Sequence, residues 1–332
     1  MTKLDIIMPI HRVHEYLNQS IESVINQSFT DFRLLVVDDS DDEVVTAHIK
    51  ETFRDSRIEI LRSNHRSVEG ALNIGLEHCN AKYIARMDAD DIAFKNRFER
   101  QIAYLEQHPH VGILGARATL IDSNNRVIGK FYPPGKPEQI KESLIHLVNP
   151  MIHPLVIFNV DQIGFFRYST NRSFMEDLGL WVTMIDDVVF SNMMETLLYY
   201  RVHEKQTSRR SYSIEQLMEM TSEIRNSRFY LNMPIDKQKR VQLFLENLIR
   251  LRTSKLSSLK FDSVLRAYSA SNYFGTKLIL EYFGTIGARA SVRIIACEKI
   301  QLSKKVKLLV ILTKRYWKAK LKRAVYPLGK EI

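Results

Sequence analysis

The sequence predicts an α/β fold followed by a mostly helical region. In the first part of the chain, short apolar segments typical of buried strands alternate with amphipathic segments typical of helices, which favours a sheet of parallel strands. Beyond about Tyr212, prolines become rare and apolar residues recur at helical spacing. We therefore expect an α/β domain at residues 1–210 and a helical domain at residues 211–332, with the boundary in the polar stretch 205–213.

The first strand is expected at Leu4–Met8, where an apolar run is stopped by Pro9. Later apolar runs predict strands at Phe32–Val37, Ile58–Leu61, Lys82–Met87, Val111–Gly115, Thr119–Asp122, Leu155–Phe158 and Leu197–Val202. Helical spacing of apolar residues predicts helices at Glu15–Gln27, Gly70–His78, Asn96–Gln107 and from Glu176 onward.

The composition is that of a soluble globular protein, with 45% apolar and 26% charged residues. The longest aliphatic run, Leu308–Leu312, is far shorter than the ~20 residues that a membrane-crossing helix needs. The amino terminus is not expected to be a signal peptide, because Asp5 and Pro9 interrupt its apolar run. Cys79 and Cys297 match no metal or redox spacing, so we expect reduced thiols in a cytoplasmic protein.

The net charge of +10 comes from a basic tail at residues 303–330. This tail contains ten Lys and Arg residues and no Asp or Glu, whereas acids and bases balance in the rest of the chain. Tyr316 and Trp317 lie among the basic groups, which is typical of a helix at an anionic membrane surface. A solvated helix that covers the core is the alternative. Nucleic acid is not an expected partner, because no motif for binding it accompanies the charge.

Aspartates are crowded directly after two of the predicted strands. One strand runs into Asp38 and Asp39, and another into Asp88, Asp90 and Asp91. In open α/β sheets the ligand crevice lies at the carboxyl ends of the strands. Crowded carboxylates repel one another unless a cation lies between them, and oxygen ligands suit Mg²⁺ or Mn²⁺, which in turn can clamp a diphosphate. The alternative is a capping cluster, since aspartate is common at turns and helix starts.

A second acidic pair, Glu176 and Asp177, precedes an amphipathic stretch and so lies at a probable helix start. The free N–H groups of the helix would hold the carboxylate of Asp177 firmly and lower its pKa. To serve as a base it would need partial desolvation or nearby negative charge, which raise the pKa. The alternative is a plain helix cap.

An ordered series of motifs runs through residues 3–210. It comprises Ile6–Pro9, Val36–Asp39, Gly70–Gly75, Arg86–Asp91, His153-Pro154, Met175–Trp181 and Tyr200–Ser208. In this order and spacing, the sequence resembles the family 2 inverting glycosyltransferases of the GT-A fold, especially bacterial enzymes that build capsule, O-antigen or exopolysaccharide. The resemblance implies a Rossmann-like nucleotide-diphospho-sugar transferase domain.

The resemblance also implies a donor site. Pro9 and His11 would border the nucleobase pocket, and Asp39 would hydrogen-bond the uracil ring. Asn73 and Arg86 would belong to the same side of the site. For Arg86 two interpretations stay open, since it can neutralise a phosphate or pair with the neighbouring aspartate.

The metal and the base are implied in the same way. Asp88 and Asp90 match the family's aspartate pair, with Asp88 near the ribose and the metal and Asp90 on the metal, Mn²⁺ or Mg²⁺. Asp177 matches the general base that deprotonates the acceptor hydroxyl. His203 lies where many members have a histidine near the metal or diphosphate, or it is a half-exposed strand end. His153 either lines the acceptor side or fills the core below it.

The expected function is transfer of a hexose or N-acetylhexosamine from a UDP-sugar to a glycan or polyprenyl-diphosphate-linked acceptor, by one direct displacement. The enzyme would lie at the inner face of the cytoplasmic membrane. A nucleotidyltransferase is a rival, but His11–His14 follows the first strand where such enzymes have a glycine-rich loop. A catalytically silent relative that binds a partner glycosyltransferase is a second rival, which retention of Asp88, Asp90 and Asp177 disfavours.

Overall fold

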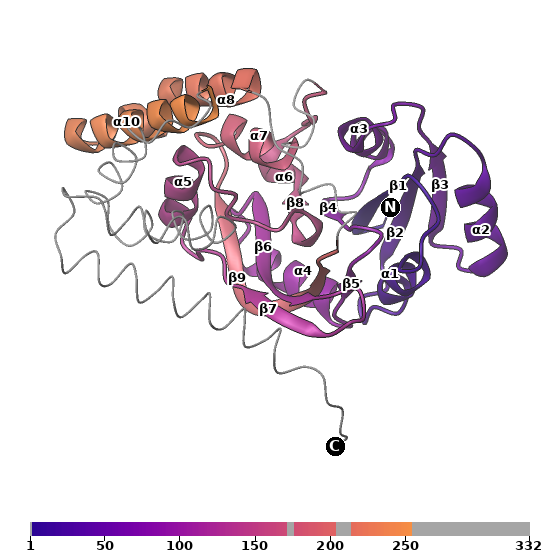
Figure 1. Cartoon of the computed structure of the whole chain (residues 1–332). Coiled ribbons are helices and arrows are strands. Elements are labelled where there is room, and N and C mark those ends of the chain that lie inside the picture. The colour runs from indigo at the N-terminus through magenta and orange to yellow at the C-terminus, as the bar shows by residue number, and fades with distance from the viewer. Residues whose placement is uncertain (1, 171–175, 204–213, 254–332) are drawn as a thin grey trace, which may run out of the picture. The chain divides into compact units, whose positions relative to one another are not determined.

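The computed structural model describes residues 2–170, 176–203 and 214–253 (Figure 1). The chain divides into two compact units, Met1–Asn232 and Met233–Ile332. The domain boundary expected at 205–213 and the basic tail at 303–330 both lie outside the described residues. Among the helices that are described, none has the length and apolar character that a membrane crossing requires.

One mixed sheet organises the first unit. Its described strands follow the order β3-β2-β1-β4-β8-β6-β9-β5, and β7 pairs with β6 (Figure 1). The parallel half consists of β3 (Ile58–Arg62), β2 (Phe32–Asp38), β1 (Leu4–Ile10) and β4 (Tyr83–Arg86). The other half consists of β8 (Ile157–Asn159), β6 (Ile113–Ile121), β9 (Phe190–Arg201), β5 (Ile92–Ala93) and β7 (Val127–Phe131).

The predicted parallel arrangement is thus right for part of the sheet only. β8 is antiparallel to both of its neighbours, β4 and β6, and so separates two parallel groups. β6 and β9 are parallel to each other, while β5 and β7 pair with them antiparallel. The α/β class is confirmed, with a reversal in the middle of the sheet that local apolar patterning does not reveal.

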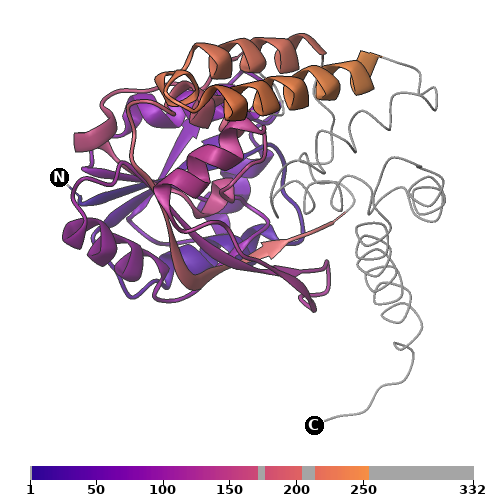
Figure 2. The ribbon, with the colours of Figure 1, turned by 90° about the vertical axis from the view of Figure 1, so that its left-hand side faces the viewer.

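Helices lie on both sides of this sheet (Figures 1 and 2). In chain order the described helices of the first unit are α1 (Leu17–Ile25), α2 (Val44–Thr52), α3 (Val68–His78), α4 (Arg97–Gln107), α5 (Pro137–Ile145), α6 (Val160–Ile163), α7 (Glu176–Thr183), α8 (Ile214–Asn226) and α9 (Arg228–Leu231). The second unit contributes α10 (Ile235–Thr253) to the described residues.

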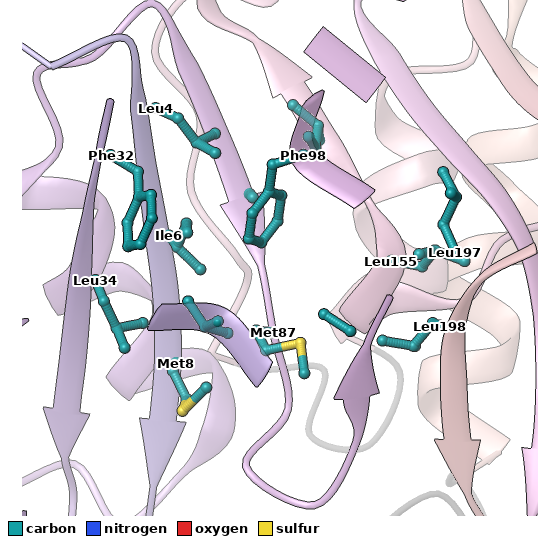
Figure 3. Packing of buried hydrophobic residues seen from close by; sticks show 14 of the residues in the cluster. Leu4, Ile6, Met8, Phe32, Leu34, Met87, Phe98, Leu155, Leu197 and Leu198 are labelled. Atoms are coloured by element: carbon teal, nitrogen blue, oxygen red, sulfur yellow. The ribbon is translucent and has the colours of Figure 1, made fainter. Parts of the chain in front are cut away.

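Alternation along β1 decides which helix covers which face. Ile6 and Met8 belong to one buried cluster with the apolar face of α1 and with Phe98 of α4 (Figure 3). Ile7 points the other way, toward α3. The backbone of α3 at Gly75 comes so close that a Cβ added to Gly75 would lie 2.5 Å from Cγ2 of Ile7. Both faces of β1 are therefore buried, which explains why its sequence is apolar apart from Asp5.

Several predicted strand limits are wrong: β9, expected from Leu197, begins at Phe190, and β8, expected from Leu155, begins at Ile157. β1 does not stop at Pro9 but continues to Ile10, with Pro9 paired opposite Val37 of β2. Pairing of β1 with β4 ends at Ile7. Pro9 has no N–H, and on this side of β1 no hydrogen bond from residue 9 to β4 is required.

The strands expected at Val111–Gly115 and Thr119–Asp122 form the single strand β6, which runs through the small and charged residues between them. The register of β6 with β9 shifts between Gly115 and Ala118, and this irregularity lets one strand continue through the break in the apolar pattern. The segment α2, the strand β7 and the helix α5 had no expected counterpart.

Candidate active site

The parallel half of the sheet carries two acidic loops to one edge. β2 and β4 flank β1 and run parallel to it, so their carboxyl ends lie on the same side. β2 ends at Asp38 and is followed by Asp39, while β4 ends at Arg86 and leads into Asp88–Asp91. The expected crevice at this edge of the sheet thus has its acidic side chains in place.

Asp39 is a fixed acceptor beside the end of β1. Its Oδ1 accepts hydrogen bonds from the Ser63 hydroxyl (2.7 Å) and from the backbone N–H groups of His65 (3.1 Å) and Arg66 (3.0 Å). Arg66 itself adopts φ 52°. These donors converge on one oxygen and hold the carboxylate of Asp39 in a single orientation.

His11 and Pro9 lie next to this aspartate. Nδ1 of His11 is 3.0 Å from the backbone oxygen of Asp39, whose own N–H donates to the carbonyl of Ile10 (2.8 Å). The structure therefore brings together Pro9, His11 and Asp39, the three residues expected around the nucleobase.

Three carboxylates converge after β4. Asp88, Asp90 and Asp91 each offer an oxygen, and these oxygens lie within 4.8 Å of one another. Asp88 is ion-paired with Arg86, Asp90 accepts from Nε2 of His203 (2.9 Å), and Asp91 accepts from the backbone N–H of Arg201 (2.7 Å).

The electrostatics of this cluster favour a cation. Burial, reinforced by the charge of neighbouring aspartates, raises the pKa of Asp90 and raises that of Asp91 well above its usual range. Asp91 is fully buried, and its Oδ2 has no hydrogen-bond partner in the described part of the protein. An orphaned buried oxygen beside two other carboxylates is the donor set that Mg²⁺ and Mn²⁺ prefer, so the residues fit such an ion.

Two of the expected metal residues, Asp88 and Asp90, belong to this cluster, while His203 contacts it from outside. Sequence reasoning assigned no metal role to Asp91, although the third acid of the motif was visible. Arg86 is fully buried: burial acts to lower its pKa, but the charge and hydrogen bond of Asp88 and the charge of Glu176 raise it. The ion pair with Asp88, one of its two interpretations, is present in the structure.

Asp177 lies in the first turn of α7, and its carboxylate is held from two sides. Oδ1 accepts from the backbone N–H of Leu178 (2.6 Å), and Oδ2 accepts from the side-chain amide of Asn149. These bonds lower its pKa, but burial and the adjacent Glu176 outweigh them, and the net shift is upward. This is the balance of desolvation and negative charge that a base at a helix start needs.

Buried His153 lies close to both Asp177 and the aspartate cluster. His153 feels the charges of Arg86, Asp177 and Asp88, and burial lowers its pKa to about 3. Its Nε2 is 2.8 Å from the hydroxyl of Tyr168, and its Nδ1 is 3.6 Å from Glu176. His153 is 5% exposed, so it lies in the interior, close to Asp177.

Asn73 of α3 holds the backbone of Tyr168, the residue whose hydroxyl contacts His153. Its amide nitrogen donates to the backbone oxygen of Tyr168 (2.9 Å), and its side-chain oxygen accepts the N–H of the same residue (2.8 Å). This two-point contact fixes the segment that carries Tyr168 against α3. Sequence reasoning identified Asn73 but missed Tyr168 and Asn149, for which no local pattern gives a signal.

Comparison with known proteins identifies the domain. The family model described as Glycosyl transferase family 2 matches residues 5–175, just over half of the chain. An uncharacterized glycosyltransferase of Haemophilus influenzae is 30% identical over 69% of this chain and 74% of its own length. The O-antigen biosynthesis glycosyltransferase WbnJ of Escherichia coli is 29% identical over 62% of this chain and 82% of its own length.

A further relative carries a printed substrate. It is the UDP-Glc:alpha-D-GlcNAc-diphosphoundecaprenol beta-1,3-glucosyltransferase WfgD of Escherichia coli, which is 32% identical over 55% of this chain and 70% of its own length.

Solved structures show the same fold at low sequence identity. S. aureus TarS 1-349 in complex with UDP-GlcNAc has a TM-score of 0.55 and 15% identity, and covers 96% of this chain and 92% of that one. The mannosyltransferase PcManGT of Pyrobaculum calidifontis, in complex with GDP-Man and Mn²⁺, has a TM-score of 0.52, with 14% identity and coverage of 96% and 88%. The GT-A fold is confirmed, and since the matched residues run from β1 to the start of α7, the chain belongs to glycosyltransferase family 2.

Proposed function

We propose that this chain is an inverting, metal-dependent hexosyltransferase of bacterial surface polysaccharide synthesis. It moves a hexose or N-acetylhexosamine from a UDP-sugar to a glycan or polyprenyl-diphosphate-linked acceptor. One observation carries the proposal: the carboxylates of Asp88, Asp90 and Asp91 converge, and the buried His153 beside them is close enough to feel the charges of both Asp88 and Asp177. The relatives add to it, since WbnJ is named for O-antigen biosynthesis and WfgD for a UDP-glucose donor and a diphosphoundecaprenol acceptor.

The donor is held at the strand ends. Asp39 offers its second carboxylate oxygen to the N–H of a uracil ring, while its first is occupied by backbone and serine donors. Asp88, Asp90 and Asp91 hold Mn²⁺ or Mg²⁺, with His203 orienting Asp90. When bound, the ion supplies positive charge that stabilises the departing diphosphate.

The acceptor reacts on the opposite side of the sugar. Ionised Asp177 takes the proton of the acceptor hydroxyl, and the oxygen forms its bond to the anomeric carbon. The bond from that carbon to the diphosphate breaks, and UDP leaves with the electron pair. A single displacement of this kind gives a β-linked product from an α-linked donor.

Nucleotide release from a panel of UDP-, GDP- and dTDP-sugars tests the reaction. Assays contain Mn²⁺ or EDTA and, as acceptor, a short lipid carrying α-linked GlcNAc diphosphate. We expect one UDP-sugar to turn over, EDTA to abolish release, and Asp177→Asn to lower kcat by at least ~100-fold with UDP binding unchanged. The matched control is Asp161→Asn, which removes an exposed carboxylate on α6.

Two results would contradict this reading. Unchanged turnover in Asp177→Asn would remove Asp177 from the chemistry. Tight binding of UDP with no turnover on any acceptor would favour the silent relative, the remaining rival. The nucleotidyltransferase rival is excluded by the family. We also propose that the basic tail, residues 303–330, docks on an anionic membrane, and this rests on the sequence alone.

A further inference from the structure

The side chain of Arg201 is fully buried at the end of β9, beside the aspartate cluster. Its Nε donates to the backbone oxygen of Asp90 (2.7 Å). Its Nη1 donates to the side chain of Asn125 (2.7 Å) and its Nη2 to the side chain of Gln19 (3.1 Å). The guanidinium carbon lies 4.1 Å from the centre of the Tyr16 ring.

The backbone of the same residue reaches the cluster directly. The N–H of Arg201 donates to Oδ1 of Asp91 (2.7 Å), so one residue holds the main chain of Asp90 and the carboxylate of Asp91 together. Two residues further on, His203 binds the carboxylate of Asp90. The end of β9 and the residues just after it thus contact two of the three converging aspartates, Asp90 and Asp91.

The partners of Arg201 come from distant parts of the chain. Gln19 and Tyr16 belong to α1 and to the turn before it, and Asn125 lies in the turn between β6 and β7 with φ 62°. Ser20 of α1 also donates to the backbone oxygen of Asp88 (2.8 Å). The loop that carries the aspartates is therefore held by α1 and by the end of β9, and through Arg201 it is connected to the turn between β6 and β7. No local sequence pattern predicts these contacts.

Removal of a guanidinium from water costs several kcal/mol, and a merely structural position could be filled by an apolar side chain. What Arg201 offers instead is a rigid, planar set of donors directed at fixed angles. A lysine carries the same charge but places its three donors on one nitrogen, so it cannot reach Asp90, Asn125 and Gln19 together.

We propose that Arg201 is a positioning residue for the cation site: it sets the path of the main chain at Asp90 and Asp91 so that the three carboxylates converge. This inference rests on the proposed function, because it assigns a role toward the ion that Asp88, Asp90 and Asp91 hold. Groups that orient the ligands of a metal typically contribute 10–100-fold to its affinity.

The test is the affinity of the full chain for Mn²⁺ alone, measured by electron paramagnetic resonance without nucleotide. We expect Arg201→Lys to raise the dissociation constant by ~10–100-fold. In the same variant, turnover should fall at low Mn²⁺ and recover largely at saturating Mn²⁺, which a general loss of folding would not allow.

Two further variants keep the test decisive. Arg33→Lys is the matched control: Arg33 also spreads hydrogen bonds over several partners, including the buried Asp5, but it lies away from the acidic loops and should leave Mn²⁺ binding unchanged. Asn125→Gly keeps the positive φ and removes one partner of Arg201, so we expect a smaller loss of Mn²⁺ affinity in the same direction. Asn125→Gly replaces Arg201→Lys as the test variant if Arg201→Lys does not fold.

The outcomes separate this inference from the proposed function. If the native chain binds Mn²⁺ and Asp90→Asn weakens it, while Arg201→Lys and Asn125→Gly bind as tightly as the native chain, the role of Arg201 is overturned and the function stands. If the native chain binds no Mn²⁺, or Asp90→Asn binds it equally well, both are overturned. Equal loss in Arg33→Lys would also overturn the role, because the effect would then be one of general stability.

Discussion

Buried ionisable groups around Asp177 have opposite shifts in pKa, and each shift has a consequence at the level of one residue. Burial favours the neutral form of every such group. It therefore raises the pKa of the acids Glu176 and Asp177 and lowers that of His153. At neutral pH His153 carries no charge, and its Nε2 can accept the hydrogen bond of the Tyr168 hydroxyl.

The shift of His153 predicts a loss of stability in mild acid. Its pKa falls from 6.5 in the unfolded chain to about 3 in the folded protein, so between these values the unfolded chain binds the proton more tightly. Folding stability from this group is full above pH 6.5 and declines as the pH falls through that window. From pH 6.5 to pH 5, a span of about 1.5 pH units at 1.36 kcal/mol each, the loss is about 2 kcal/mol.

Urea unfolding at pH 7 and pH 5 measures this. His153→Gln keeps a side chain that can bond Tyr168 but does not titrate, so it should lose about 2 kcal/mol less than the native chain over that interval. Comparison of the two proteins cancels the contribution of the other acids. If both proteins lose the same free energy, His153 is not held neutral by the fold.

At the level of elements, a close contact between α3 and β1 positions the site. α3 carries Asn73, and Gly75 lies against Ile7 of β1 two residues before Pro9. An added Cβ at Gly75 would lie 2.5 Å from the Cγ2 of Ile7, a distance that real contacts do not reach. The helix can take its place only because this position has no side chain.

Gly75→Ala should therefore destabilise the protein by about 1–3 kcal/mol, as overpacking of a filled core does. The matched control is Gly129→Ala on β7, where an added Cβ would meet Leu120 at 3.4 Å, an ordinary contact. Chemical unfolding of the two variants beside the native chain measures the difference. A loss no larger in Gly75→Ala than in Gly129→Ala would show that α3 shifts freely on the sheet.

At the scale of the whole molecule, the cluster of Asp88, Asp90 and Asp91 joins the two halves of the sheet. Asp88 follows β4 of the parallel half, while Asp91 precedes β5, which pairs with β9 of the other half. A ligand that binds these side chains only in the folded state stabilises all the elements that hold them.

Mn²⁺ should raise the Tm of the native chain. At a concentration 100-fold above its dissociation constant, the gain is about 2.7 kcal/mol, which corresponds to several degrees for a protein of this size. Differential scanning fluorimetry with Mn²⁺ or EDTA measures the shift. Asp91→Asn should abolish most of it and Asp161→Asn should not. An equal shift in both variants would place the ion elsewhere.

Local patterns in the sequence were enough to predict the α/β class, most helices and strands of the parallel half, and the acidic loops at the ends of β2 and β4. It could do so because apolar periodicity is local, and because parallel strands on either side of β1 necessarily end at one edge. The motif order of residues 3–210 also sufficed for the family, which the matched model confirms. The roles assigned to single residues stay predictions until they are tested.

Only the tertiary structure decided which distant residues complete the site. Arg201 is more than 100 residues from Asp90, and Tyr168 is 95 residues from Asn73, so no spacing in the sequence indicates that they touch. The reversal at β8 and the merging of two short runs into β6 likewise depend on strand pairing across the sheet. Apolar patterns specify which segments are buried. Which strands pair, and which distant side chains meet at the aspartate cluster, depends on packing in three dimensions.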